Sequence, residues 1–122
     1  MKPGKTGIVR IFDAAGYSMK GIKYSWKNES AFRQELILAS IMLPAAFFIG
    51  QTSVEIALML FSIFVVIIVE LLNTGLEAIV DKASPEMNPL AGAAKDCGSA
   101  AVFFALLNVV VIWGLIIASH FI

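Results

Sequence analysis

Three long stretches with almost no charge constrain the fold of this 122-residue chain more than any other feature. Residues 36–54 and 97–119 carry no charged side chain, and residues 56–80 carry only Glu70 and Glu77. About 20 mostly apolar residues in a helix are enough to cross the hydrocarbon core of a bilayer. The sequence therefore predicts an all-α membrane protein of one domain, residues 1–122, with transmembrane helices over about 31–49, 54–81 and 92–119.

Composition and charge narrow the class further. The chain is 59% hydrophobic and 15% charged, whereas soluble domains are about 45–50% apolar and about 25% charged. This excludes a disordered chain and a nucleic-acid binder, and the single cysteine excludes a disulfide scaffold. The formal net charge is zero. However, basic residues exceed acidic ones in residues 1–35, and the reverse holds afterwards. The positive-inside rule then predicts a cytoplasmic N-terminus.

The segment before the first span has its own pattern. Its apolar residues recur at helical spacing and fall within about 60° of one line when drawn on a helix. They are Ile8, Ile11, Phe12, Ala15, Met19, Ile22 and Trp26. Three lysines, at 20, 23 and 27, lie together on one flank. We expect an amphipathic helix over about 5–28 at the membrane surface. A simple membrane anchor explains the same pattern.

The second predicted span carries a polar stripe. Glu70, Asn73, Thr74, Glu77 and Asp81 fall within an arc of about 100° on a helix. A charged side chain at mid-bilayer costs at least about 2.5–3.5 kcal/mol. A polar seam between helices is one explanation. Three acids on one face repel each other unless a proton or cation lies among them, so the pattern favours a functional site.

Further polar residues flank the cytoplasmic ends of the predicted spans. They are Glu29, Arg33, Gln34, Glu35, Glu86, Asn88, Lys95 and Asp96. A salt bridge between Glu29 and Arg33 is an equally good explanation of that pair, and Asp96 suits a helix N-terminus. Carboxylates suit Mg²⁺ and basic groups suit phosphates, so the set indicates Mg–nucleotide chemistry. The glycines near the start of the third span, Gly92 and Gly98, favour close helix packing. No GxxxxGK[ST] phosphate loop or Cys/His metal spacing is present.

Four ordered motifs then carry a resemblance to a known family. The string Glu70-Leu-Leu-Asn73-Thr-Gly-Leu-Glu77-Ala-Ile-Val-Asp81 resembles the ExxNTAIExxVD signature of the small bacterial integral-membrane diacylglycerol kinases. The segments AKDCGSAA, AAGYSMKGIKYSW and NESAFRQE are similar to other motifs of that family. Gly75 departs from the signature, which usually has Ala. The loop SPEMNP departs too, because relatives often carry His there.

The resemblance implies a homotrimer in the bacterial inner membrane, with its active site on the cytoplasmic side. That family moves the γ-phosphate of Mg–ATP to diacylglycerol. By motif match, Glu70 is the general base, Glu29 and Glu77 bind Mg²⁺, and Asn73 and Asp81 support them. The implied ATP contacts are Arg10, Tyr17, Glu29, Glu77, Glu86, Asn88, Lys95 and Asp96. The implied lipid contacts are Arg10, Ala14, Ser18, Met19, Lys23, Trp26, Ala31, Phe32, Arg33, Gln34, Glu35, Glu70 and Ser99.

Other functions are compatible with parts of the pattern. A related undecaprenol kinase would share the fold and differ in its lipid acceptor, although the long amphipathic segment and the AFRQE string favour diacylglycerol. A small channel or transporter subunit would use Glu70, Asn73 and Glu77 to line an ion path. A non-catalytic membrane scaffold would need the same residues for stability alone.

Overall fold

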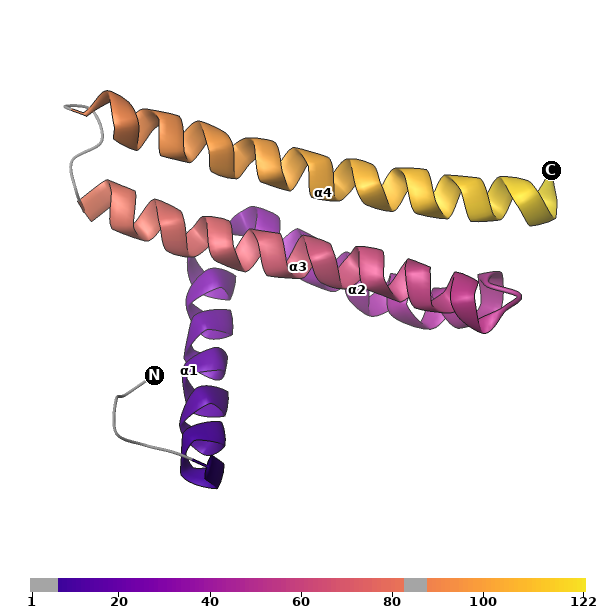
Figure 1. Ribbon diagram of the computed structural model, residues 1–122, viewed down its shortest axis with the longest axis horizontal. Coiled ribbons are helices and arrows are strands. Elements are labelled where there is room, and N and C mark those ends of the chain that lie inside the picture. The colour runs from indigo at the N-terminus through magenta and orange to yellow at the C-terminus, as the bar shows by residue number, and fades with distance from the viewer. Residues whose placement is uncertain (1–6, 83–87) are drawn as a thin grey trace.

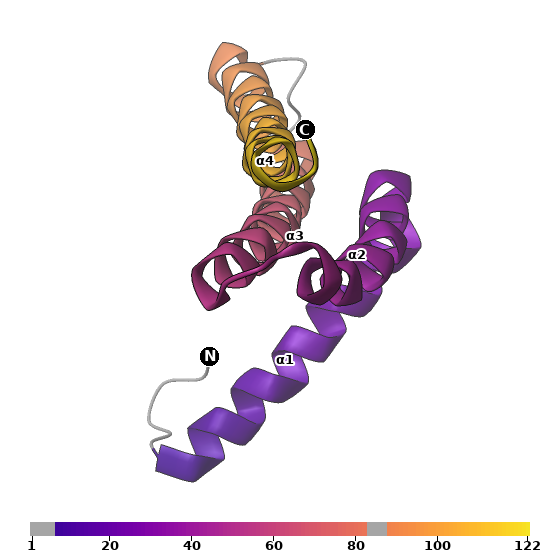
Figure 2. The same ribbon diagram turned by 90° about the vertical axis from the view of Figure 1, so that its right-hand side faces the viewer.

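A computed structural model describes residues 7–82 and 88–122, and these fold into four helices. They are α1 (Gly7–Asn28), α2 (Ser30–Ile49), α3 (Ser53–Lys82) and α4 (Pro89–Phe121). The last three run side by side, with α3 in contact with both α2 and α4, whereas α1 lies crosswise to them (Figure 1, Figure 2). Helices α2, α3 and α4 are long and apolar enough to cross a membrane, which confirms the prediction of three spans.

The turn between α2 and α3 explains why two helices meet there. A Cβ atom on Gly50 would lie 2.6 Å from Cγ1 of Ile56, so only glycine fits against the start of α3. The Glu55 backbone N–H donates to Thr52 Oγ1 at 3.1 Å, and the Glu55 carboxylate accepts from the Gln51 backbone N–H at 2.9 Å. This reciprocal capping satisfies N–H groups that have no partner inside the helix. The local sequence therefore ends one helix and begins the next.

The core of the bundle lies between the three long helices. Its buried residues come from α2, α3 and α4 and are Ala39, Ala46, Met59, Ile63, Trp113 and Ile116. One polar pair lies beside them: the indole N–H of Trp113 donates to Ser62 Oγ at 3.1 Å, and Ser62 in turn donates to the Met59 carbonyl. This satisfied pair ties α4 to α3 without leaving a buried polar group unpaired.

The outward faces of the long helices are strongly apolar. Phe48 on α2 is 87% exposed, and Phe61, Phe103 and Phe104 are each more than half exposed. Contiguous apolar surface of this kind is unusual on a soluble monomer and marks contact with lipid or another protein. The exposed surface therefore agrees with the membrane assignment made from length and hydropathy.

Candidate active site

The polar stripe of α3 faces the other helices where α1 joins α2. Glu70 and Thr74 are buried, at 5% and 4% exposure, although their side chains are polar. Asn73 and Glu77 are half-buried, and Asp81 is exposed at the end of α3. The Thr74 hydroxyl donates to the Glu70 carbonyl at 3.0 Å, which satisfies it within the helix. The Thr74 hydroxyl therefore does not donate to a carboxyl group of the stripe.

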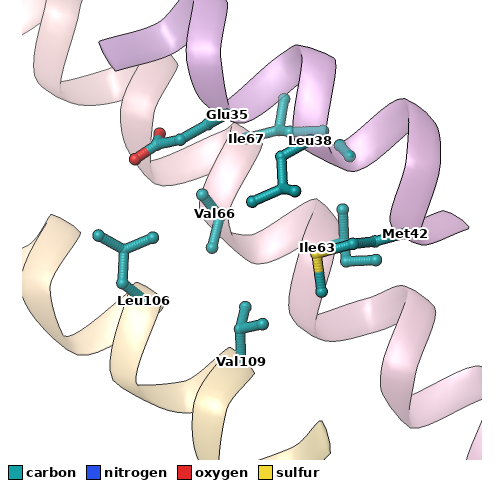
Figure 3. Close-up of a pocket in the computed structure, with 9 residues that line it drawn as sticks. Glu35, Leu38, Met42, Ile63, Val66, Ile67, Leu106 and Val109 are labelled. Carbon is teal, nitrogen blue, oxygen red and sulfur yellow. The ribbon is translucent and has the colours of Figure 1, made fainter.

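Glu70, the deepest acid of the stripe, has a second carboxyl group beside it. This group belongs to Glu35 of α2, whose side chain lies within hydrogen-bonding range of Glu70. Glu35 Oε2 is buried and has no hydrogen-bond partner among the described residues. In Figure 3, Glu35 lies at one side of an apolar pocket whose lining includes Leu38, Met42, Val66 and Leu106. A carboxyl pair therefore borders an apolar groove between α2, α3 and α4.

A second carboxyl pair lies nearer the end of α3. Glu29 occupies the single non-helical residue between α1 and α2, and its side chain reaches the carboxyl group of Glu77. Burial, with the neighbouring Glu77 carboxyl, raises the pKa of Glu29. The Asn73 amide donates to Glu77 Oε1 at 3.5 Å. These two oxygen donors fit a hard cation, which would relieve their repulsion.

The described residues contain no cluster of three or more His, Cys, Asp or Glu side chains able to hold a metal ion. The described part of the chain therefore offers a pair of carboxylates at this point rather than a closed metal cage. Mg²⁺ is commonly bound in this way, by one or two carboxylates with the rest of its shell from water and substrate phosphates. The geometry fits the Glu29 and Glu77 assignment without requiring a third protein ligand.

The start of α4 brings a basic group to the same end of the bundle. Lys95 Nζ lies 3.0 Å from Asp81 Oδ1, and this ion pair joins α4 to α3. Asp96 follows it and is exposed. Asn88 caps α4, because its side chain accepts from the Leu90 backbone N–H at 2.9 Å. Asn88 thus has a structural role beside the implied nucleotide contact, and Glu86 lies outside the described residues.

Residues implied to hold lipid fall into two groups. Phe32 is only 1% exposed and belongs to the packed interior, whereas Trp26, Ala31, Gln34 and Ser99 are exposed. Between α1 and α3 lies a groove whose lining includes Ser18, Gly21, Ser25, Thr74 and Gly75. The structure therefore brings Ser18 to the polar stripe but leaves the exposed group on outer surfaces.

The junction between α1 and α2 is fixed by Arg33. Its Nη1 donates to the carbonyl of Trp26 at 2.7 Å and more weakly to that of Lys27 at 3.4 Å. These carbonyls end α1 and carry the negative end of its dipole. Across residues 7–82 and 88–122, no ion pair joins Glu29 to Arg33, so the salt-bridge explanation of that pair is wrong for this structure. Glu29 remains available to Glu77.

The first half of α1 leads away from this site. In Figure 1 the helix extends outward from the bundle, and its N-terminal end is remote from α3 and α4. Arg10 belongs to that end. Tyr17 lies further along α1, where its ring is under Lys20 of the same helix, with 5.6 Å from Nζ to the ring centroid. Ala14, Met19 and Lys23 also belong to α1. A single chain therefore does not bring Arg10 to the Glu29 and Glu77 pair.

Comparison with known proteins identifies the family. The family model for prokaryotic diacylglycerol kinase matches residues 16–117. The chain belongs to the prokaryotic diacylglycerol kinase family. A diacylglycerol kinase of Haemophilus influenzae is 46% identical over 109 residues, covering 89% of this chain and 92% of the relative. Those of Escherichia coli K12 and Pseudomonas aeruginosa are 41% and 44% identical, covering 99% and 93% of each chain.

Membership of the prokaryotic diacylglycerol kinase family makes this chain an ATP-dependent kinase, as the motifs predicted.

One departure from the family signature is tolerated structurally. A Cβ atom on Gly75 would meet no atom within 4 Å, so the usual Ala would fit there. Two contacts in the site were not predicted from the sequence: that of Glu35 with Glu70, and that of Gly98 with Asn73. Both join separate helices, and neither has a signal in local spacing.

Proposed function

We propose that this protein transfers the γ-phosphate of Mg–ATP to the free hydroxyl of diacylglycerol, giving phosphatidic acid and ADP. The observation that carries the proposal is the order of acids along α3. Glu70 is buried beside an apolar groove, and Glu77 is seven residues nearer the end of the helix. That is about 10 Å along the axis. This order is compatible with a lipid hydroxyl that approaches from the membrane side and a water-soluble nucleotide that approaches from the end of the helix.

Glu70 is the residue that acts on the lipid. The acceptor hydroxyl gives its proton to the Glu70 carboxylate as its oxygen forms a bond to the γ-phosphorus. The bond from that phosphorus to the bridging oxygen breaks, and ADP leaves with the electron pair. A base placed within hydrogen-bond reach of the hydroxyl typically contributes about 10²–10⁴-fold. The apolar residues that line the groove beside Glu35 give this carboxyl pair an apolar setting, which is compatible with a lipid acceptor.

Glu29 and Glu77 would hold Mg²⁺, and Asn73 orients Glu77 through its amide. The ion supplies charge neutralisation for the phosphates, which together with positioning accounts for most of phosphoryl-transfer catalysis. Lys95, held by Asp81, offers a cation to the same region. The chain would act as a single kinase domain and as a homotrimer in the bacterial inner membrane. Its surplus of N-terminal basic residues supports a cytoplasmic active site.

The test is a phosphorylation assay on the purified protein in mixed micelles. With labelled ATP and Mg²⁺, we expect thin-layer chromatography to show phosphatidic acid from diacylglycerol, with slower labelling of undecaprenol. Faster labelling of undecaprenol would assign the protein to that acceptor instead. Ion flux through liposomes without labelled lipid would favour a channel. Absence of both activities would indicate a non-catalytic scaffold.

A further inference from the structure

Gly98 on α4 lies directly against Asn73 on α3. A Cβ atom built on Gly98 would overlap Asn73 Oδ1 and would lie 3.2 Å from Asn73 Cγ. Gly98 is buried, and it lines the same groove between α3 and α4 as Asn73. We infer that Gly98 is a positioning residue for the metal-binding pair. Because Gly98 has no side chain, the Asn73 amide has room to take the orientation in which it donates to Glu77.

The orientation of the amide follows from its two neighbours. Asn73 Nδ2 donates to Glu77 Oε1, so the carbonyl side of the amide points the other way, toward α4. A flipped amide would set Oδ1 against a carboxylate, which cannot donate a hydrogen bond when it is ionised. Oδ1 has no hydrogen-bond partner among the described residues and is buried. Only close approach to Gly98 accommodates it.

This contact explains a glycine that helix formation alone does not favour. Glycine inside a helix costs about 1 kcal/mol relative to alanine. At three other helical positions, Gly75, Gly92 and Gly114, an added Cβ would meet nothing within 4 Å. At Gly98 it would collide with a side chain of the proposed site. The sequence predicted close packing here, and the structure assigns the partner of that packing.

The inference deepens the proposed function and rests on it, since it concerns how Glu77 is kept ready for Mg²⁺. In Gly98→Ala the methyl group displaces the Asn73 amide, so Glu77 loses its donor and its fixed direction. Metal binding should weaken, while the lipid-side groups Glu35 and Glu70 stay where they are. Gly114→Ala is the matched control, because it adds the same methyl group to the same helix, at a position where nothing lies within 4 Å.

Two measurements separate a positioning role from general damage. The first is the Mg²⁺ concentration for half-maximal activity. The second is Mn²⁺ binding with a non-hydrolysable ATP analogue, followed by electron paramagnetic resonance without any lipid substrate. We expect Gly98→Ala to weaken both severalfold and Gly114→Ala to leave both unchanged. Equal metal dependence in the two variants would overturn the inference while leaving the kinase assignment intact.

A double variant tests whether Gly98 acts through Asn73. Asn73→Ala removes the group that the new methyl would strike, so adding Gly98→Ala to it should change neither metal affinity nor heat stability further. If Gly98→Ala fails to fold, Asn73→Ala/Gly98→Ala should restore folding. Failure of the double variant too, or additive losses in metal affinity, would show that Asn73 is not the partner. Absence of phosphatidic acid from the wild type would count against the proposed function, and the Mn²⁺ measurement would still decide the contact.

Discussion

At the scale of single residues, the burial of a carboxylic acid, Glu70, within a long apolar helix requires an explanation. It is 5% exposed within a helix apolar enough to span a membrane, and a second carboxyl group lies beside it. A buried acid that only packed helices together would be replaceable by an amide of the same shape. A base could not be replaced in that way, because glutamine has no carboxylate to accept the proton.

Glu70→Gln should therefore lower kcat by about 10²-fold or more while leaving Mg–ATP binding unchanged. The measurement is phosphatidic acid formation in mixed micelles, with nucleotide binding followed separately on the same preparation. Heat stability of the variant serves as the control for folding. Full activity with normal stability would remove Glu70 from the base role and favour a packing seam.

Glu29→Gln and Glu77→Gln should each raise the Mg²⁺ concentration required for half-maximal activity, because each removes one of two adjacent oxygen anions. Glu55→Gln is the control at the opposite end of α3, where the carboxylate caps the helix and lies 2.6 Å from His120 Nε2. Its metal titration should match that of the wild type. Unchanged titrations in both site variants would refute their assignment as ligands.

The raised pKa of Glu29 also predicts a pH dependence of stability. The folded state binds this proton more tightly than the unfolded chain, so the free energy of unfolding should fall as the pH rises from about 4.5 through the raised pKa. Without divalent metal, heat unfolding in micelles should show this loss as the pH rises above about 4.5. Glu29→Gln should flatten the dependence of stability on pH. Parallel slopes in the wild type and the variant would show that Glu29 is not the cause of this dependence.

The sequence predicted the stripe on α3 because its residues share one helix, whose period is fixed by backbone geometry. It did not predict that Glu35 meets Glu70, or that Asn73 meets Gly98. Those contacts depend on how two helices cross and on their relative rotation, which side-chain packing decides. The family resemblance placed Glu35 among lipid contacts and was silent on its partner in the protein.

At the scale of elements, the three spans could be anticipated because length and hydropathy determine them. Helix ends were less certain. The last span was expected from about residue 92, yet α4 begins at Pro89, since Asn88 caps it and proline suits the first turn. The turn at Gly50 likewise depends on contact with Ile56, which no local spacing reveals.

The cap of α4 gives a prediction at this scale. Asn88→Ala should lower stability by about 1 kcal/mol, because it leaves the Leu90 N–H without its acceptor. Asn88→Asp should keep the cap and most of the stability. If Asn88 also contacts nucleotide, the two variants should share a raised KM for ATP. A normal KM in Asn88→Ala would leave it with the capping role alone.

At the scale of the whole molecule, one chain does not assemble the entire set of implied contacts. Arg10 lies in the first turn of α1, which leads away from α3 and α4. Glu29, Glu77 and Lys95 lie instead at one end of the bundle, near the start of α2, the end of α3 and the start of α4. The outward faces of the helices are apolar enough to need lipid or another subunit against them. In the proposed trimer, α1 of one subunit would therefore complete the site of its neighbour.

Mixing inactive variants tests this arrangement. Arg10→Ala and Glu70→Gln should each be nearly inactive alone if both residues serve the reaction. Co-assembled in equal amounts, they should regain activity in about a quarter of the sites, because a site shared across a cyclic interface then draws an intact Arg10 and an intact Glu70 from different subunits. Sites built within one chain would regain nothing, since every chain carries one defect. The control is simple mixing of the two proteins after each has assembled, which should stay inactive.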